Sequence, residues 1–288
     1  MPDCHDEVTR HKKPDWLKIK LHNSSNFGEV ARIVQEHGLH TICSSGRCPN
    51  QAECWSRRTA TFMILGEICT RSCKFCATAT GKPLPPDPDE PQKLARSVRL
   101  MGLKHCVVTS VTRDDLPDGG AEIWAEAVRA VRRENPDTSI ELLIPDFDAR
   151  EDLIDTVIAA KPDIIGHNVE TVARLTPQVR SRARYEVSLK TLSHIARSGC
   201  RTKSGLMVGL GETDDEVLAA IDDLVANGGQ YLRPTLKHLP VADYVTPEKF
   251  ATYKEEALRR GMLYVESGPM VRSSYMAEKA MQCCGSKK

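Results

Sequence analysis

The alternation of apolar and polar positions divides the chain into one long regular portion and two less regular ends. Between residues 59 and 260, short apolar runs alternate with longer segments in which apolar residues recur every three or four positions. The run TATFMILGEIC at 59–69 predicts the first strand, and QYLRPTL at 230–236 predicts the last. Strands that alternate with helices in this way are typical of a parallel sheet with right-handed crossovers.

Six strands and their helices predict an α/β fold, a partial (β/α)6 TIM-type barrel. A closed barrel of eight such units normally takes about 250 residues by itself, which is more than the regular portion contains. Loops at the C-terminal ends of the strands carry the chemistry in such barrels. The other expected elements are strands at 105–111, 139–145, 163–168 and 203–211, and helices at 91–102, 121–135, 149–161, 171–178, 187–198, 213–228 and 247–260.

Three helix ends carry recognisable signals in the sequence. Gly102 predicts the end of one helix, because glycine adopts the left-handed conformation that commonly follows a helix. Asp148 is the expected N-cap of the helix that follows it. Thr213 and Glu216 have the T-x-x-E spacing of a capping box, which predicts a helix start at that point.

The portions outside the barrel are expected to be extensions of it. We assign residues 1–58 to an N-terminal extension, 59–260 to the barrel and 261–288 to a C-terminal extension. One helix is expected in the first extension, with its buried face formed by Val30, Ile33 and Val34.

Composition and charge exclude several classes of protein. The 288 residues include 40 basic and 39 acidic ones, so no overall charge recruits nucleic acid or a membrane surface. No run of 18 or more apolar residues predicts a membrane span, and the first 20 residues lack the apolar core of a signal peptide. We therefore expect a globular cytoplasmic protein.

Six of the eleven cysteines fall within residues 43–76, in two groups of three. Cys69, Cys73 and Cys76 have the spacing C-x3-C-x2-C directly after the first expected strand. Three thiolates on one short loop are too many for chance, and half a zinc site would need a partner pair of ligands that the sequence lacks. A four-iron cluster with one open iron fits better, because an open position distinguishes catalytic from structural metals.

This loop resembles the signature of the radical S-adenosylmethionine (SAM) superfamily. In that superfamily the same three cysteines follow the first strand of a partial barrel, and the residue before the third cysteine is usually aromatic, as Phe75 is here. The resemblance implies that SAM chelates the open iron of a 4Fe–4S cluster through its amino and carboxylate groups. One electron then cleaves SAM and releases a 5′-deoxyadenosyl radical.

The other three cysteines narrow the resemblance to one family. Cys43-x4-Cys48-x5-Cys54 is similar to the motif that holds an auxiliary 4Fe–4S cluster in the lipoyl synthase family. Further segments that look like that family lie at 109–121, 143–147, 167–172, 204–213, 238–241 and 268–275. The likeness therefore covers nearly the whole chain.

The resemblance also supplies a fourth ligand for the auxiliary cluster. In the family it is a serine of the R-S-S-Y motif, which maps to Ser274, with Ser273 as the alternative. Alkoxide is a hard ligand in a soft iron–sulfur setting, so this corner of the cluster is labile. Lability would help a cluster that is dismantled during turnover, which makes Ser274 a catalytic residue as well as a ligand. The other interpretation is that Arg272–Tyr275 only caps the barrel.

Two polar residues near the end of the strand at 163–168 are candidate contacts of SAM. Asn168 and Glu170 can reach ribose or methionyl atoms, or alternatively they cap a helix. His167 and His238 also lie near strand ends, but both are expected to be hydrogen-bonded core histidines.

The family resemblance implies a reaction and its partners. Two sulfur atoms from the auxiliary cluster are inserted at C6 and C8 of a protein-bound octanoyl group, which becomes the lipoyl group. The implied partners are an octanoylated carrier (glycine cleavage H protein or a 2-oxoacid dehydrogenase E2 domain), an electron donor such as flavodoxin or ferredoxin, and an iron–sulfur cluster carrier. No nucleic acid or membrane partner is expected. The alternatives are another sulfur-inserting radical SAM enzyme with an auxiliary cluster, a methylthiotransferase acting on RNA, and a non-catalytic zinc or iron–sulfur scaffold.

The reaction sets a condition on geometry. An alkyl chain must lie between the two clusters, so the two cysteine groups are expected to face one another across an apolar channel. We expect residues 1–58 to reach this position by packing across the C-terminal mouth of the barrel.

Overall fold

The computed structural model of the chain describes residues 13–18, 25–224, 226–235 and 237–283. Its central feature is an eight-stranded sheet in which every neighbouring pair of strands is parallel, except the first pair. In spatial order the strands are β1 (His40–Thr41), β2 (Thr61–Ile64), β5 (His105–Ser110), β6 (Ser139–Leu143), β7 (Ile164–Gly166), β8 (Thr202–Val208), β9 (Ala226–Gln230) and β10 (Ser267–Gly268).

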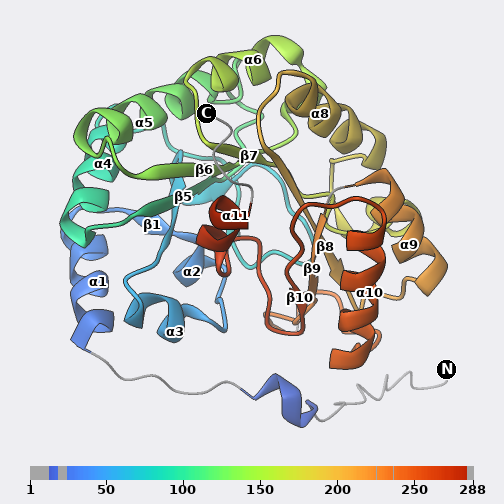
Figure 1. Ribbon diagram of the computed structural model, residues 1–288. Helices are drawn as coiled ribbons and strands as arrows, with labels where there is room; N and C mark the ends of the chain where they lie inside the picture. The colour runs from blue at the N-terminus through green and yellow to red at the C-terminus, as the bar shows by residue number, and fades with distance from the viewer. Residues whose placement is uncertain (1–12, 19–24, 225, 236, 284–288) are drawn as a thin grey trace, which may run out of the picture.

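Helices surround the outer side of this curved sheet (Figure 1). Those of the barrel are α4 (Glu90–Met101), α5 (Ala121–Glu134), α6 (Glu151–Ala159), α7 (Thr176–Val179), α8 (Tyr185–Arg197), α9 (Asp214–Asp223) and α10 (Pro247–Arg259). The ends of the chain add α1 (Ser25–Glu36), α2 (Ile42–Ser45), α3 (Gln51–Ser56) and α11 (Ala277–Cys283). The six parallel strands from β2 to β9, with helices between them, confirm the predicted partial barrel.

Several predicted helix signals are confirmed. Gly102 follows α4 with φ 63°, in the left-handed conformation. Thr213 and Glu216 form both hydrogen bonds of the capping box at the start of α9. The buried face of α1 contains the three predicted residues, which are Val30, Ile33 and Val34.

Three predictions about element positions are wrong. Asp148 does not cap α6, because it lies inside a short 3-10 turn (Phe147–Ala149) with φ 54°, and α6 begins only at Glu151. The helix expected at 213–228 ends at Asp223, and the last barrel strand is β9, not 230–236. The two glycines at 228–229 favour this result, because glycine is a poor helix former.

The two faces of the strands differ in chemistry. Alternate residues such as Phe62, Val108 and Leu142 are buried in the apolar core beneath the helices. The strand register places Thr61 and Glu141 on the other face, which lines the barrel lumen. The lumen therefore contains polar groups from Thr61 and Glu141 beside apolar ones such as Val107.

The connection from β1 to β2 decides where the first extension lies. β1 pairs antiparallel with β2, so α2 and α3, which join the two strands, lie at the N-terminal end of β2. The expectation that residues 1–58 cross the C-terminal mouth is wrong for the described part of this segment. Two antiparallel strands joined by a short connection keep that connection at one end of the pair. Here it is the end where β2 starts, which is opposite to the C-terminal mouth of the barrel.

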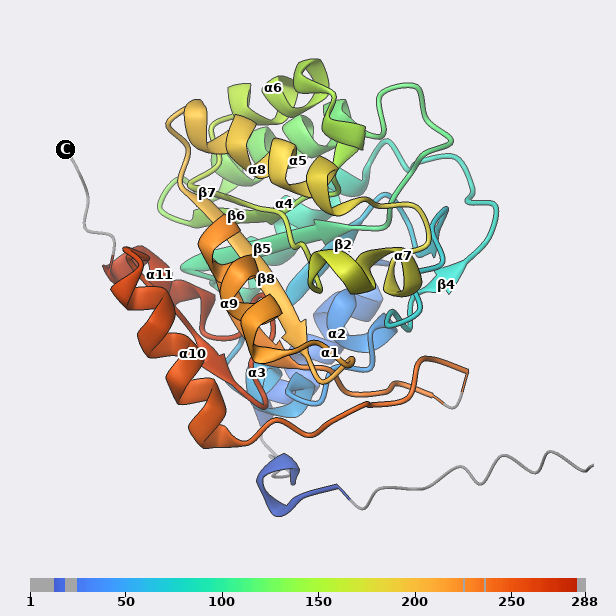
Figure 2. The ribbon, with the colours of Figure 1, turned by 90° about the vertical axis from the view of Figure 1, so that its right-hand side faces the viewer.

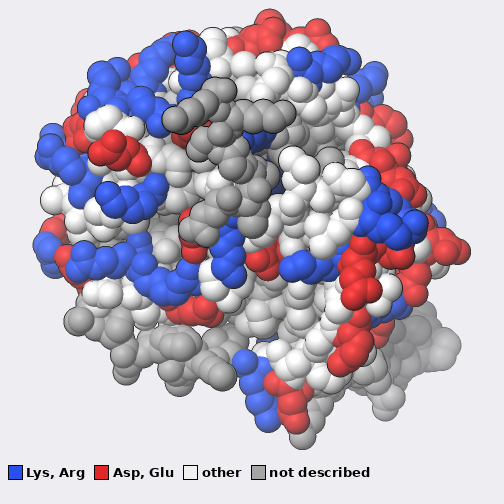
Figure 3. Space-filling view, in the orientation of Figure 1, with Lys and Arg blue, Asp and Glu red and all other residues white. Residues whose placement is uncertain are grey.

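The two ends of the barrel carry different segments. Figure 2 shows α11 at one end of the strands, with α7 and β4 (Ala79–Thr80) at the other. Figure 3 shows basic and acidic side chains together on the face of Figure 1, with acidic ones gathered at the right beside α9 and α10. Among the residues described, no helix combines the length and the apolar character needed to cross a bilayer.

Candidate metal and cofactor site

A turn after β2 brings the chain to the second group of cysteines. Leu65 adopts φ 69°, a left-handed conformation that is uncommon for a leucine. The buried carboxylate of Glu90 accepts hydrogen bonds from the backbone N–H of Leu65 at 2.6 Å and of Gly66 at 3.4 Å. Arg113 donates to the Leu65 carbonyl oxygen at 3.1 Å. These contacts stabilise the turn that leads to Cys69.

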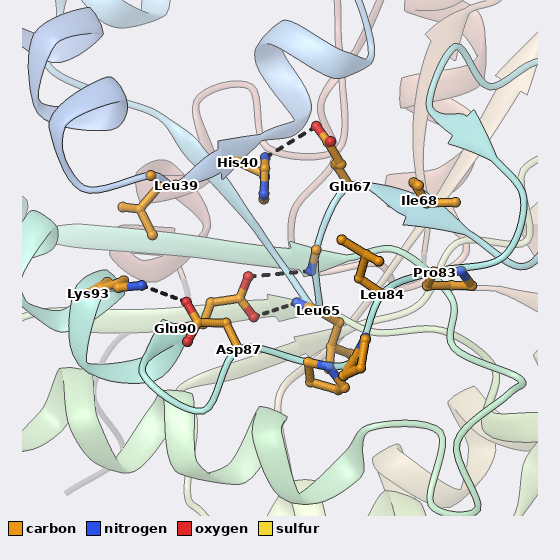
Figure 4. Close-up of a pocket in the computed structure, with 14 residues that line it drawn as sticks. Leu39, His40, Leu65, Glu67, Ile68, Pro83, Leu84, Asp87, Glu90 and Lys93 are labelled. Carbon is orange, nitrogen blue, oxygen red and sulfur yellow. Dashed lines mark hydrogen bonds and ion pairs between the residues drawn. The ribbon is translucent and has the colours of Figure 1, made fainter.

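A small cavity of about 200 Å³ lies behind this turn (Figure 4). It is lined by residues 38–40, 65–68 and 83–87, together with Glu90 and Lys93. None of the six clustered cysteines lines it. The cavity is therefore separate from the candidate metal site, although Glu90 in its wall orients the loop that carries Cys69.

The thiol of Cys69 is tied to the end of a neighbouring strand. Its Sγ accepts hydrogen bonds from the backbone N–H of Arg71 at 3.4 Å and of Thr112 at 3.3 Å. Thr112 follows β5, so the cysteine loop lies at the C-terminal ends of the strands. Hydrogen bonds to sulfur tune the reduction potential of an iron–sulfur cluster.

Electrostatics at Cys73 and Cys76 suit a cationic group. Burial raises the pKa of both thiols, and the negative charges of neighbouring cysteines raise it further. The charge of Arg180 opposes this at Cys73. Thiolates that repel one another in a buried site need a positive centre between them. Soft thiolates at this spacing fit three irons of a 4Fe–4S cluster.

Arg71 fixes the loop between Cys69 and Cys73. Its guanidinium donates to both carboxylate oxygens of Asp114 at 2.9 Å and to Asp146 at 2.8 Å. Only 7% of the Arg71 side chain is exposed. Burial opposes ionisation of Asp146, but Arg71 outweighs it and lowers the pKa of that carboxyl to about 2. The result is a rigid, charged support beneath the cysteine loop.

The other three cysteines gather before β2. Cys43 lies in α2 and Cys54 in α3, and the backbone N–H of Cys48 donates to the Cys43 carbonyl at 3.0 Å. Burial raises the pKa of Cys48, and raises that of Cys54 to about 12 with a contribution from the charges of Cys48 and Cys43. Arg272 lowers the pKa of Cys48 through its charge. This triad has the same donor chemistry as the first.

The C-terminal segment packs directly against this triad. Tyr275 donates from its hydroxyl to Glu53, the neighbour of Cys54, at 3.1 Å. Asn50, between Cys48 and Cys54, donates to the Met270 carbonyl at 2.6 Å. The R-S-S-Y motif therefore lies beside the three cysteines, as an oxygen ligand from this motif requires.

The two serines of the motif have different partners. Thr61, at the start of β2, donates from Oγ1 to Ser274 Oγ at 2.6 Å. Ser273 Oγ accepts a hydrogen bond from Asn168 Nδ2 at 2.7 Å, and its carbonyl accepts one from Lys203. Ser273 is therefore held within the barrel lumen, whereas Ser274 is oriented toward the start of β2.

The candidate SAM contacts lie between the two triads. The carboxyl of Glu170 has a pKa raised by burial, while Arg180 and Asn168 act against that rise. Its charge also acts on Cys73, which places it beside the cysteine loop. Gly205 makes room for Asn168, because a Cβ at that glycine would lie 2.6 Å from Asn168 Oδ1. Phe75 is partly buried and packs against an apolar cluster of the barrel that includes Val169, Leu206 and Phe250.

Of the two histidines expected in the core, His167 is confirmed and His238 is not, because His238 is only half-buried. His167 is buried, with Nδ1 2.9 Å from the Ile144 carbonyl and Nε2 3.0 Å from Ser188 Oγ. The Nε2 of His238 lies 2.9 Å from the Cys76 carbonyl. Because a carbonyl only accepts, that nitrogen carries a proton and helps to hold the cysteine loop.

The arrangement of thiols differs from that of a zinc site. Within the described ranges, no three side chains of His, Cys, Asp or Glu converge on the position of a single metal ion. Ligands of a 4Fe–4S cluster do not converge in this way, because each cysteine binds a different iron. The described thiols are therefore not arranged for a single zinc ion.

Sequence reasoning missed several residues that shape the site. They are Thr61, Arg71, Glu90, Glu141 and Lys203, and the one weak signal that each offers is a charged or hydroxyl side chain within a strand, within the cysteine loop or, for Glu90, at the start of a helix. Each acts through partners distant in the chain. No local pattern identifies such partners.

Comparison with known proteins shows the family. The model of the radical SAM superfamily matches residues 63–224. A lipoyl synthase of Bacteroides fragilis (strain YCH46) is 59% identical over 276 residues, which cover 94% of this chain and 96% of that protein. A lipoyl synthase of Treponema denticola is 55% identical over 274 residues, covering 93% and 94% respectively.

Solved structures support the fold alone, because their sequences are distant. Methylornithine synthase has a TM-score of 0.56 at 11% identity, covering 84% of this chain and 75% of its own. HydG, a maturase of the FeFe hydrogenase, has a TM-score of 0.54 at 10% identity, covering 84% and 63%.

These similarities decide between the alternatives that the sequence left open. Identity of this degree to lipoyl synthases, over nearly the full length, shows that the chain is neither a zinc scaffold nor an RNA methylthiotransferase. The cofactors of the family are SAM and 4Fe–4S clusters, including an auxiliary cluster. The chain belongs to the lipoyl synthase family, a group of enzymes within the radical SAM superfamily.

Proposed function

We propose that this enzyme inserts two sulfur atoms at C6 and C8 of a protein-bound octanoyl group to form the lipoyl group. The observation that carries the proposal is the position of the two cysteine triads. One precedes the start of β2 and the other follows its end, so the barrel lumen lies between them. A substrate chain in the lumen could then be reached from both sides.

Each cluster has a proposed set of ligands. Cys69, Cys73 and Cys76 would hold the first 4Fe–4S cluster and leave one iron open for SAM. When bound, this cluster supplies the electron that cleaves SAM, and the auxiliary cluster supplies sulfur.

Cys43, Cys48 and Cys54 would hold the auxiliary cluster together with Ser274. We prefer Ser274 to Ser273 because Asn168 and Lys203 already engage both the hydroxyl and the carbonyl of Ser273. The Thr61 hydroxyl is the one hydrogen-bond donor described for Ser274 Oγ, which leaves that oxygen a free lone pair.

The protein groups around the open iron position the reactants. We propose that Asn168 and Glu170 contact ribose or methionyl atoms of SAM, and that Phe75 packs beside the cluster loop. Unactivated C–H bonds yield to no acid or base that proteins contain, so the protein contributes orientation and exclusion of water, and the cofactor supplies the radical. Arg71 serves orientation, because it rigidly supports the cysteine loop.

We propose that the three portions of the chain have separate duties. Residues 1–58 supply the auxiliary cysteines, residues 59–260 form the radical SAM barrel, and residues 261–288 supply the serine. The contacts of Asn50 with Met270 and of Tyr275 with Glu53 support this division, because they join the two extensions at the auxiliary site.

Enzymes of this family act on lipoyl-carrier proteins and need a reductant. We propose that the carrier is the glycine cleavage H protein or an E2 domain of a 2-oxoacid dehydrogenase. Flavodoxin or ferredoxin is the proposed electron donor, and an iron–sulfur carrier the proposed source of new clusters. The net charge of +1 supports the absence of a nucleic acid or membrane partner. We place the reaction in the cytoplasm, where the free thiols stay reduced.

One incubation tests the proposal. Reconstituted enzyme, SAM, a reductant and an octanoylated carrier peptide are combined without oxygen, and the peptide is weighed by mass spectrometry. We expect the peptide to gain two sulfur atoms with no net change in hydrogen as the reduced dithiol, and to lose two hydrogen atoms once air oxidises it to the cyclic disulfide. Cleavage of SAM without any gain of sulfur would instead indicate a different radical SAM reaction.

A further inference from the structure

The ion pair between Lys203 and Glu141 lies inside the barrel lumen, and neither residue is a proposed ligand of a cluster or of SAM. Lys203 on β8 donates from Nζ to Glu141 Oε1 on β6 at 2.7 Å. Only 14% of the Lys203 side chain and 3% of the Glu141 side chain are exposed. The pKa of Glu141 is lowered, because the charge of Lys203 and contacts with His105 outweigh the effect of burial. Glu141 is therefore a buried carboxylate with Lys203 as its ion-pair partner.

Lys203 has a second partner, which belongs to the C-terminal segment. Its Nζ donates to the carbonyl oxygen of Ser273 at 2.7 Å. The same serine is held on its other side by Asn168. The next residue along the chain is Ser274, whose hydroxyl contacts Thr61. Two residues of the lumen, Asn168 and Lys203, therefore hold Ser273, which immediately precedes the proposed ligand Ser274.

A buried ion pair is a poor device for stability alone. Removing two charges from water costs several kcal/mol, and well-packed apolar residues of similar size are often as stabilising. The lysine of this pair also donates a hydrogen bond to the Ser273 carbonyl, which an apolar side chain could not do. It selects one position of the segment, since any shift along the lumen breaks a charge-assisted hydrogen bond.

We infer that Lys203, held in place by Glu141, is a positioning residue that fixes the Ser273–Ser274 segment inside the barrel. It acts on the auxiliary cluster through the segment and does not touch the reacting atoms. Only this last link rests on the proposed function, because the placement of the segment is a property of the protein without clusters.

Hydrogen exchange of the cluster-free protein tests the placement. In the wild type, the backbone N–H groups of Val271 and Tyr275 donate within the segment to Gly268 and Arg272. We expect the variant Lys203→Met to raise exchange in a peptide covering residues 268–276 by about tenfold or more, as the loss of a charge-assisted hydrogen bond predicts. Glu141→Gln keeps an oxygen acceptor for Lys203 and should raise exchange less.

Two further variants keep the test sharp. Lys203→Met leaves the buried Glu141 without its lysine, with His105 Nε2 3.4 Å away, so the paired change Lys203→Met with Glu141→Leu removes both charges and should still release the segment. Arg132 is the matched control, because it too pairs with a carboxylate, Asp163 at 2.8 Å, and donates to backbone carbonyls, but outside the lumen. Arg132→Met should leave exchange at 268–276 unchanged.

The second link is tested on the reconstituted enzyme. Lys203→Met should release iron from the auxiliary cluster to a chelator several times faster than wild type, with SAM cleavage unchanged. Wild-type exchange at 268–276 in both Lys203 variants would overturn the inference. So would faster exchange spread evenly over the whole chain, because that indicates general destabilisation. Faster segment exchange together with no auxiliary cluster in the wild type would contradict the proposed function and leave the placement standing.

Discussion

Asn168 and Ser273 are hydrogen-bonded across 105 residues of sequence, with Asn168 Nδ2 donating to Ser273 Oγ at 2.7 Å. Asn168 follows β7, on the side of the barrel where the candidate SAM contacts lie. Ser273 belongs to the segment that packs against the auxiliary cysteines. This one contact therefore connects the surroundings of the two proposed clusters.

A double-mutant cycle should measure that connection. Asn168→Ala and Ser273→Ala each remove one partner, and we expect a coupling of about 1 kcal/mol between them, the usual net value of a neutral hydrogen bond. The measurement is urea unfolding of the cluster-free protein for wild type, both single variants and the double variant. Strictly additive losses would show that the hydrogen bond contributes nothing to stability.

Changes in the two cysteine triads should separate two activities. Replacing Cys69, Cys73 and Cys76 by alanine should leave about half of the iron and abolish SAM cleavage, because the open iron is lost. The same change at Cys43, Cys48 and Cys54 should also remove about half of the iron but retain 5′-deoxyadenosine production. Iron analysis and chromatography of the nucleoside give both quantities. Complete loss of SAM cleavage in a folded variant of the second kind would refute the separation.

The proposed serine ligand can be tested by making it softer. Ser274→Cys offers a thiolate, which should hold its iron more firmly and allow SAM cleavage while sulfur insertion falls sharply. Ser274→Ala should likewise yield little product. The same two changes at Ser273 are the control and should reduce product much less. Product near the wild-type level for Ser274→Cys would mean that a labile corner plays no part in the reaction.

Removing Arg71 should destabilise the barrel beneath the cysteine loop. Arg71→Met leaves the buried carboxylate of Asp146 without its cation, which typically costs about 3–5 kcal/mol in the free energy of unfolding, whereas the half-buried Asp114 keeps Arg182 at 3.4 Å. Urea unfolding of the cluster-free protein measures the loss. The control is Arg129→Met on the surface of α5, where loss of the exposed pair with Glu122 should change stability far less, because solvent screens exposed charges. Equal losses for both variants would contradict the proposed support of the loop.

His167 should make stability depend on pH in a mildly acidic range. Burial lowers the pKa of His167 from its ordinary value of 6.5 to about 4 in the folded protein. The unfolded chain then binds the proton more readily, so the stability present above pH 6.5 is lost as the pH falls toward 4. The loss attributable to this residue should reach roughly 3 kcal/mol at most.

The measurement for His167 is urea unfolding of the cluster-free protein at several pH values. His167→Gln retains a donor and an acceptor for the Ile144 carbonyl and Ser188, but does not titrate. Its curve should be flatter than that of the wild type between pH 4 and 6.5. Parallel curves for the two proteins would assign the pH dependence to other groups.

Much of the fold could be predicted because its signals are local. The apolar run before Cys69 and the capping box at Thr213 lie within a few residues of the features they specify. The expected N-cap at Asp148 failed because a single residue type says little once the chain enters a tight turn. The position of residues 1–58 also failed, since the direction of β1 depends on a pairing that no local pattern encodes.

The candidate site shows the same division. Cysteine spacing identified both triads, because the three cysteines of each triad lie within a dozen residues of one another. Glu141 and Lys203 lie on separate strands, 62 residues apart, and meet only because the barrel closes around the lumen. A charged residue at an inward-facing strand position was the one available signal. Its meaning depends on a partner that only the folded chain brings near.

The contact between Asn50 and Met270 spans 220 residues, and this separation has a consequence for how the enzyme is made. The ribosome synthesises the three auxiliary cysteines early and the R-S-S-Y motif among the last residues. Folding generally begins at the N-terminus while synthesis continues. A growing chain can therefore present three thiols to a cluster carrier before any serine exists to complete the set. We predict that chains stalled on the ribosome before residue 268 bind the auxiliary cluster in a chelator-sensitive form, and that release of full-length chain makes it resistant. Equal resistance in stalled and released chains would show that translation and completion of the cluster are independent.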